Sequence, residues 1–195
     1  MNRLAIKILL ILSMSTAVQA TDEYLTLLGF KLEKTNLFEI QKRLGNVPIK
    51  QAGDAGDSYY GICYLSRENN ATVYFESGEM GGYEHTLLNF VVKNALEKSQ
   101  KCGELKNNVG DLKLGVIKLG KSIDEVRKEL PQPVKVVADG LEYRQMTRLP
   151  FTKEDIERTK IKDLNEAYWD VSVTIRVFEE NGTVSGYEVS KVTSW

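Results

Sequence analysis

The side chains that could carry chemistry in this sequence are few and far apart. His85 is the one histidine, and its nearest acidic neighbours are Glu79 and Glu84, which together make too small a ligand set for a metal. The sequence has no nucleophile elbow, P-loop or dinucleotide fingerprint. We therefore expect no enzymatic activity, no cofactor and no metal, and we interpret His85 as a sheet residue. A hydrolase that uses carboxylates is the remaining enzymatic alternative.

Two acidic segments could be taken for sites. Asp54 and Asp57 lie in AGDAGDS, but the spacing and the terminal glutamate of an EF-hand loop are absent. We interpret this segment as a solvated glycine-rich loop. The carboxylates of residues 153–157 alternate with Lys and Arg, which is typical of a solvated helix face.

Cys63 and Cys102 are the only cysteines of the 195 residues. If the chain is exported, an oxidising environment favours one disulfide between them. The disulfide would close a loop of about 40 residues and contribute about 3–4 kcal/mol in the chain-entropy model. A redox or nucleophilic thiol is the alternative, but the sequence contains no CxxC motif.

Residues 1–20 have the pattern of a secretory signal peptide. Arg3 and Lys7 give a basic start, and the apolar run that follows is too short to span a membrane. Ala17-Val18-Gln19-Ala20 then has the small residues of a cleavage site. Removing the two basic residues leaves 24 basic and 27 acidic residues, a net charge of −3. We therefore expect a periplasmic or secreted protein without a membrane anchor, and no nucleic-acid partner.

The sequence pattern predicts that the elements positioning a site occur twice along the chain. An offset of 86 residues aligns Leu28-Gly29 with Leu114-Gly115, and two helix starts with each other. Asn36 with Glu39, and Ser122 with Glu125, have the spacing of a capping box. Apolar residues follow at helical spacing in both segments, and Gly45 and Pro131 end them.

Strand patterns follow each predicted helix. We expect strands at 47–50 and 59–65, then at 134–137 and 141–147, with a hairpin after each pair. The fold class predicted is α+β, with two tandem repeats that each pack a helical segment on a four-stranded antiparallel sheet. The corresponding boundaries are a signal peptide at 1–20, a first repeat at 21–92, a linker at 93–112 and a second repeat at 113–195.

The segment Gly115–Val126, with Leu130 and Pro133, resembles the opening of SmpA/OmlA-type envelope domains. Two such units in tandem resemble the fold of the β-lactamase inhibitor protein (BLIP-like). That resemblance implies aligned sheets with a concave, aromatic-rich binding surface. The chain departs from the first family in lacking a lipid-acceptor cysteine, and from the second in having no cysteine in its second repeat.

The aromatic residues of the predicted strands provide the functional hypothesis. Tyr74 and Phe178 should point away from the helices, where tyrosine and other aromatic residues often anchor protein interfaces. The alternative is that the aromatic residues fill the interface between repeats or simply favour strands. The function predicted is an exported, non-catalytic protein-binding module, inhibitor-like or immunity-like, and the alternative is a cell-envelope assembly or structural factor. The candidate protein-binding residues are Tyr59, Tyr60, Tyr64, Tyr74 and Phe178.

Overall fold

The computed structural model describes residues 22–54, 58–97, 101–106, 110–161 and 167–195. The predicted signal peptide, residues 1–20, lies outside these ranges. The helical elements are η1 (Glu23–Leu25), α2 (Leu37–Leu44), η2 (Glu79–Gly81), α3 (Ile123–Glu129) and α4 (Lys153–Thr159). The strands are β1 (Thr26–Leu27), β2 (Phe30–Lys31), β3 (Lys50–Ala52), β4 (Tyr59–Ser66), β5 (Ala71–Gly78), β6 (Asn89–Lys93), β7 (Gly103–Glu104), β8 (Val134–Val137), β9 (Gly140–Pro150), β10 (Tyr168–Glu180) and β11 (Thr183–Ser194).

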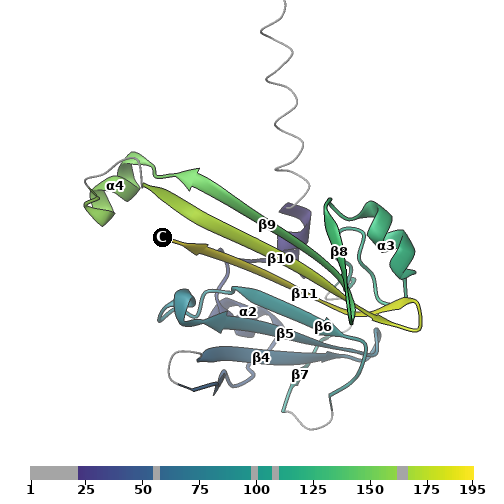
Figure 1. Cartoon of the computed structure of the whole chain (residues 1–195). Coiled ribbons are helices and arrows are strands. Elements are labelled where there is room, and N and C mark those ends of the chain that lie inside the picture. Colours follow the sequence, from purple (N-terminus) through teal and green to yellow (C-terminus); the bar gives the residue numbers. More distant parts are fainter. Residues whose placement is uncertain (1–21, 55–57, 98–100, 107–109, 162–166) are drawn as a thin grey trace, which may run out of the picture.

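All strands from β3 to β11 belong to one continuous sheet (Figure 1). Its order is β3-β4-β5-β6-β11-β10-β9-β8, every neighbouring pair is antiparallel, and the short β7 pairs in parallel with β4. The α+β class predicted from the sequence is confirmed. The edges of β6 and β11 pair with each other from Gly186↔Lys93 to Ser190↔Asn89, so the backbone groups of this stretch are not left at a free edge.

The predicted division into two tandem repeats, each with its own four-stranded sheet, is wrong. The β6–β11 pairing carries the sheet without a break from the first half of the chain into the second. The resemblance to tandem SmpA/OmlA-type domains and to the BLIP-like fold is therefore also wrong, because it required two separate units and the sheet is continuous. The helices also differ, because α2 buries Leu37, Ile40 and Leu44, whereas α3 buries only Val126.

A single hydrophobic core spans both halves of the chain on one face of the sheet. Phe75, Phe90, Val189 and Ile175 are in register across four neighbouring strands and are fully buried. Burial of each such side chain stabilises the fold by about 1.5–3 kcal/mol. The opposite side of this core consists of α2 and the N-terminal segment, with buried residues Tyr24, Leu25, Leu27, Phe30, Leu32, Leu37, Ile40 and Leu44.

The two predicted capping boxes have different outcomes. At α2 the prediction is confirmed, because the Asn36 side chain accepts from the Glu39 backbone N–H and Glu39 accepts from the Asn36 N–H. At α3 the prediction is wrong, because the Ser122 side chain makes no capping hydrogen bond. The N–H of Ile123 instead donates to the carbonyl oxygen of Gly182 in the β10–β11 turn, at 3.1 Å. A tertiary contact therefore satisfies a donor that a local cap would otherwise satisfy.

The strand predictions differ from the structure mainly at their ends. The first predicted strand, 47–50, is replaced by β3, which begins at Lys50. The strand β9 continues to Pro150, and β10 pairs with it over its full length, so these two strands extend well past the core. The polar segment after Pro150 forms α4, whose N-terminus is capped by Thr152 and Asp155.

Candidate binding surface

The second face of the sheet carries the polar and aromatic side chains that alternate with the core residues. Figure 1 shows α2 behind the strands, with α3 and α4 toward the two ends of the sheet. We call this second face, on β3, β4, β5, β6, β9, β10 and β11, the open face. The strand register places one row across it, formed by Glu142, Arg176, Glu188, Val91, Tyr74 and Cys63. A neighbouring row contains Arg144, Thr174, Ser190, Asn89, Glu76, Gly61 and Lys50.

Arg176 lies on β10, in the half of the open face formed by the C-terminal strands, among three carboxylates. Its guanidinium nitrogens are 3.5 Å from Asp139, 3.9 Å from Glu142 and 3.9 Å from Glu188. The guanidinium also lies over the ring of Phe178, 5.6 Å from the ring centroid. The buried Nε of Arg176 has no hydrogen-bond acceptor among the described residues. This cation is therefore held mainly by charge, and several of its N–H groups can still donate.

Asn89 bridges two carboxylates of the same face. Its Nδ2 donates to Glu76 at 2.8 Å and to Glu188 at 3.1 Å. Burial, and secondarily the nearby Glu188 charge, raise the pKa of Glu76, although the Asn89 hydrogen bond and the Lys93 charge oppose this. The buried Oδ1 of Asn89 has no donor within the described ranges. Acceptors thus exceed donors in this part of the open face.

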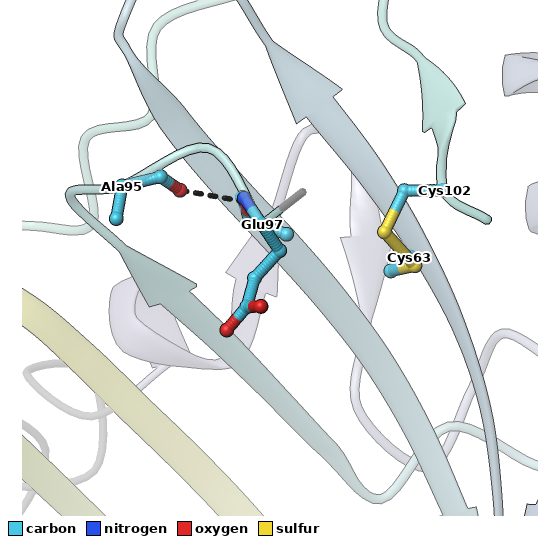
Figure 2. The surroundings of a disulfide bond; sticks show 5 residues. Cys63, Ala95, Glu97 and Cys102 are labelled. Atoms are coloured by element: carbon cyan, nitrogen blue, oxygen red, sulfur yellow. Dashed lines mark hydrogen bonds between the residues drawn. A yellow bond between two sulfur atoms is a disulfide. The ribbon is translucent and has the colours of Figure 1, made fainter. Parts of the chain in front are cut away.

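The predicted disulfide between Cys63 and Cys102 is confirmed (Figure 2). It ties the segment after β6, described at residues 94–97 and 101–104, to the sheet, and we call this segment the strap. The strap is also fixed through Thr72, whose hydroxyl donates to the Ala95 carbonyl oxygen at 2.6 Å and accepts from the Glu97 N–H at 3.0 Å. The strap therefore covers one margin of the open face.

A pocket of about 350 Å³ opens at the β3 end of the open face. Gly61 and Cys63 of β4 line it together with Tyr74 and Glu76 of β5 and Val91 of β6. The other lining residues are Val47, Pro48, Lys50, Gln51, Ala52, Tyr59, Ile62 and Lys93. Burial, followed by the charge of Glu97, raises the pKa of Tyr74 to about 12. The pocket thus combines apolar walls with one carboxylate, two lysines and phenol groups.

The structure divides the five predicted protein-binding residues into two groups. Tyr59, Tyr74 and Phe178 lie on the open face by strand alternation, and Tyr74 and Phe178 are half-buried, as expected. Tyr64 is instead a core residue, fully buried, with its hydroxyl donating to the Gly45 carbonyl oxygen at 2.7 Å. Tyr60 also faces the core side, because in a strand successive side chains alternate between the two faces. Tyr64 therefore has no surface to offer to a partner.

His85 does not lie in a strand, contrary to the prediction. It occupies a turn between η2 and β6 with a φ of +50°. Its ring packs against Tyr60 at 4.2 Å and Phe38 at 5.6 Å between centroids, and its buried Nδ1 has no hydrogen-bond partner among the described residues. No cluster of three metal-binding side chains occurs among the described residues, and Asp57 of the acidic loop lies outside them.

Sequence reasoning missed the polar members of the open face. Arg176 and Glu188 each occur between apolar residues of a strand, Glu76 follows Phe75, and Asn89 begins β6 before Phe90. Such alternation indicates only that these residues face away from the core. Their mutual contacts depend on pairing between strands far apart in the chain, such as Asn89 with Glu188. The alternation could therefore have identified the face but not the network.

Comparisons with known proteins find no related family and one distant structural similarity. No protein-family model and no curated protein sequence matches the chain. One solved structure, an extracellular protein containing an SCP domain from Bacillus anthracis str. Ames, is similar with a TM-score of 0.41 and 10% sequence identity. The similarity covers 84% of this chain and 49% of that protein, so this chain corresponds to about half of its length. At this level the similarity supports no conclusion about fold or function.

Within the ranges that the structure describes, no helix is both long enough and apolar enough to cross a membrane. The disulfide is consistent with export to an oxidising compartment.

Proposed function

We propose that this chain is an exported, non-catalytic module that binds another protein through the open face of its sheet, as an inhibitor or immunity factor does. The observation that carries the proposal is the content of this face. Arg176 and Asn89 each keep a buried polar atom without a hydrogen bond within the described structure. Such orphan groups are rare in folded proteins and require an explanation.

Aromatic side chains on the same face support the proposal. Tyr74 on β5 and Phe178 on β10 are separated by the two strands β6 and β11, and each lies beside a cation, Lys93 and Arg176 respectively. Interfaces are enriched in tyrosine, phenylalanine and arginine, and these residues carry much of the binding energy. The spacing of the two aromatic side chains would let a partner contact both at once.

We propose a binding module and not an enzyme because the cysteines and the histidine, the most reactive side chains of the chain, already have contacts within the fold. Both cysteines form the disulfide, and His85 is packed between two aromatic rings. The disulfide and the predicted signal peptide support a periplasmic or secreted location.

The test is co-purification of the tagged mature protein, residues 21–195, with envelope and secreted fractions of the source organism. We expect a stoichiometric protein partner with the wild type and its loss with Tyr74→Ala/Phe178→Ala. Truncation of one anchor at the centre of an interface costs about 2 kcal/mol or more, or about thirtyfold in affinity. Tyr83→Ala is the matched control, because Tyr83 is fully exposed in a turn. Circular dichroism confirms that each variant is folded.

Two results would contradict the proposal. The first is an unchanged affinity for the partner in the folded double variant. The second is the absence of any protein partner combined with an outer-membrane permeability defect on deletion, which would favour the envelope-factor alternative.

A further inference from the structure

The pocket at the β3 end of the open face contains a gap in a row of side chains. The strand register places Lys50, Gly61 and Glu76 side by side on β3, β4 and β5. Gly61 contributes no side chain, so the space between Lys50 and Glu76 is part of the pocket. The backbone of Gly61 does not have a positive φ, and a Cβ added there would be 3.6 Å from Cγ of Glu76. Neither strain nor a clash requires glycine at this position.

The Glu76 carboxylate that borders this gap has few hydrogen-bond donors. Asn89 donates to Oε2, and the described residues supply no other hydrogen bond to this carboxylate. The Asn89 Nδ2 group is already shared with Glu188, whose negative charge disfavours the ionised form of Glu76. Lys93 lies over the ring of Tyr74, 5.3 Å from its centroid, and forms no ion pair with Glu76.

This arrangement restricts what can fill the pocket. Any occupant removes water from Glu76, and an ionised carboxylate that loses water without gaining a donor is strongly destabilised. An apolar occupant would leave the charge of Glu76 unpaired. An acidic group placed against Glu76 would be repelled by it, and such a group would instead be attracted to the exposed Lys50 and Lys93 at the same pocket. A guanidinium or ammonium group supplies several donors and an opposite charge. Its alkyl stem would fit the apolar walls, which include Val47, Pro48 and Val91.

We propose that this pocket receives an arginine or lysine side chain of the protein partner, with its cationic group against Glu76. The inference rests on the proposed function, since it assigns the chemistry of one contact within that binding surface. Lys50 and Lys93 line the same pocket and are exposed. They are placed to pair with an acidic residue next to the inserted basic one, so the recognised element is a basic residue flanked by an acidic residue.

Small probes test the pocket without the partner. We would titrate ¹⁵N-labelled mature protein with N-acetyl-argininamide and with N-acetyl-citrullinamide, which has nearly the same shape but no charge. The expected result is a saturable shift of the Gly61 and Glu76 amide signals with a dissociation constant of about 1–20 mM for the arginine probe. The neutral probe should bind at least about fivefold more weakly, because it lacks the charge-assisted hydrogen bond.

Two variants connect that response to the pocket. Gly61→Val adds a side chain in the gap, in a strand that accommodates β-branched residues, and should abolish the arginine response. Glu76→Gln retains an acceptor for Asn89 and should reduce the difference between the two probes to less than about twofold, since the charge is removed. Equal binding of both probes to the wild type, or an unchanged response in Gly61→Val, would overturn the inference.

The partner assay separates this inference from the proposed function. If Tyr74→Ala/Phe178→Ala loses the partner and Gly61→Val retains it fully, the open face binds the partner but the pocket does not receive a basic side chain. If both variants lose the partner and both remain folded, the pocket inference is supported. If the wild type recovers no partner, the proposed function fails, and the probe titration still decides whether the pocket selects cations.

Discussion

Removal of the disulfide is the perturbation whose magnitude follows most directly from the structure. Cys63 and Cys102 are 39 residues apart, so the bond closes a loop of about 40 residues in the unfolded chain. The chain-entropy relation gives about 4 kcal/mol of stabilisation for a loop of this size. We therefore expect Cys63→Ala/Cys102→Ala to lower the free energy of unfolding by about 4 kcal/mol, a large part of the stability of a domain this size.

Urea unfolding followed by circular dichroism measures this change, with the oxidised wild type as the reference. The reduced and alkylated wild type is a second comparison, and mass spectrometry without reductant should detect no free thiol in the untreated protein. Local loss of the strap is measured by amide hydrogen exchange at Leu105, whose N–H donates to the Leu65 carbonyl oxygen at 2.9 Å beside the disulfide. A decrease of less than about 1 kcal/mol in the unfolding free energy would refute the loop-closure reasoning. Leu105 exchange that stays as slow as in the wild type would refute the role of the disulfide in holding the strap.

Three further predictions concern single side chains. Asn36→Ala should lower the unfolding free energy by about 1 kcal/mol, because the Asn36 side chain makes a capping hydrogen bond. Ser122→Ala should change it by less than about 0.5 kcal/mol, because the Ser122 side chain makes none. Equal losses in chemical denaturation would contradict this prediction. Because burial raises the pKa of Glu76, its ionisation destabilises the fold as pH rises from about 4 through the raised pKa. Glu76→Gln should therefore raise the melting temperature at pH 7 and show a smaller gain at pH 4, and a gain independent of pH in a thermal scan would contradict the assignment. Tyr187→Phe should cost about 1–3 kcal/mol in denaturation, since the buried hydroxyl donates to the Leu112 carbonyl oxygen at 2.9 Å; no loss would show that this carbonyl finds another donor.

Local sequence patterns predicted most secondary structure because the forces involved are local. Leu37, Ile40 and Leu44 at helical spacing predicted α2 with its correct bounds, and the Asn36 cap was confirmed. The predicted direction of Phe178, away from the helices, agrees with the structure, in which Val173, Ile175 and Val177 form the buried side of β10. At such positions the residue spacing already specifies which side chains can share a face.

The predictions failed where distant segments interact. The spacing of Ser122 and Glu125 has the form of a capping box, but the carbonyl oxygen of Gly182 accepts the first helical N–H instead. Tyr64 is of a residue type common at binding surfaces, but its position in β4 points it toward the core. Its hydroxyl there donates a hydrogen bond to the Gly45 carbonyl oxygen. Neither contact has a signal within the neighbouring sequence, because both partners lie many residues away.

The sequence by itself determined most of the helices and strands, the alternation that separates core from open face, and the two cysteines available for a disulfide. Only the tertiary structure decided that β6 pairs with β11, and that pairing merges the two halves of the chain into one sheet with one core. The same pairing brings Asn89 to Glu188 and completes the polar network of the open face. The physical reason is that strand pairing satisfies generic backbone groups, so its partners are selected by the packing of the whole core and not by any local motif.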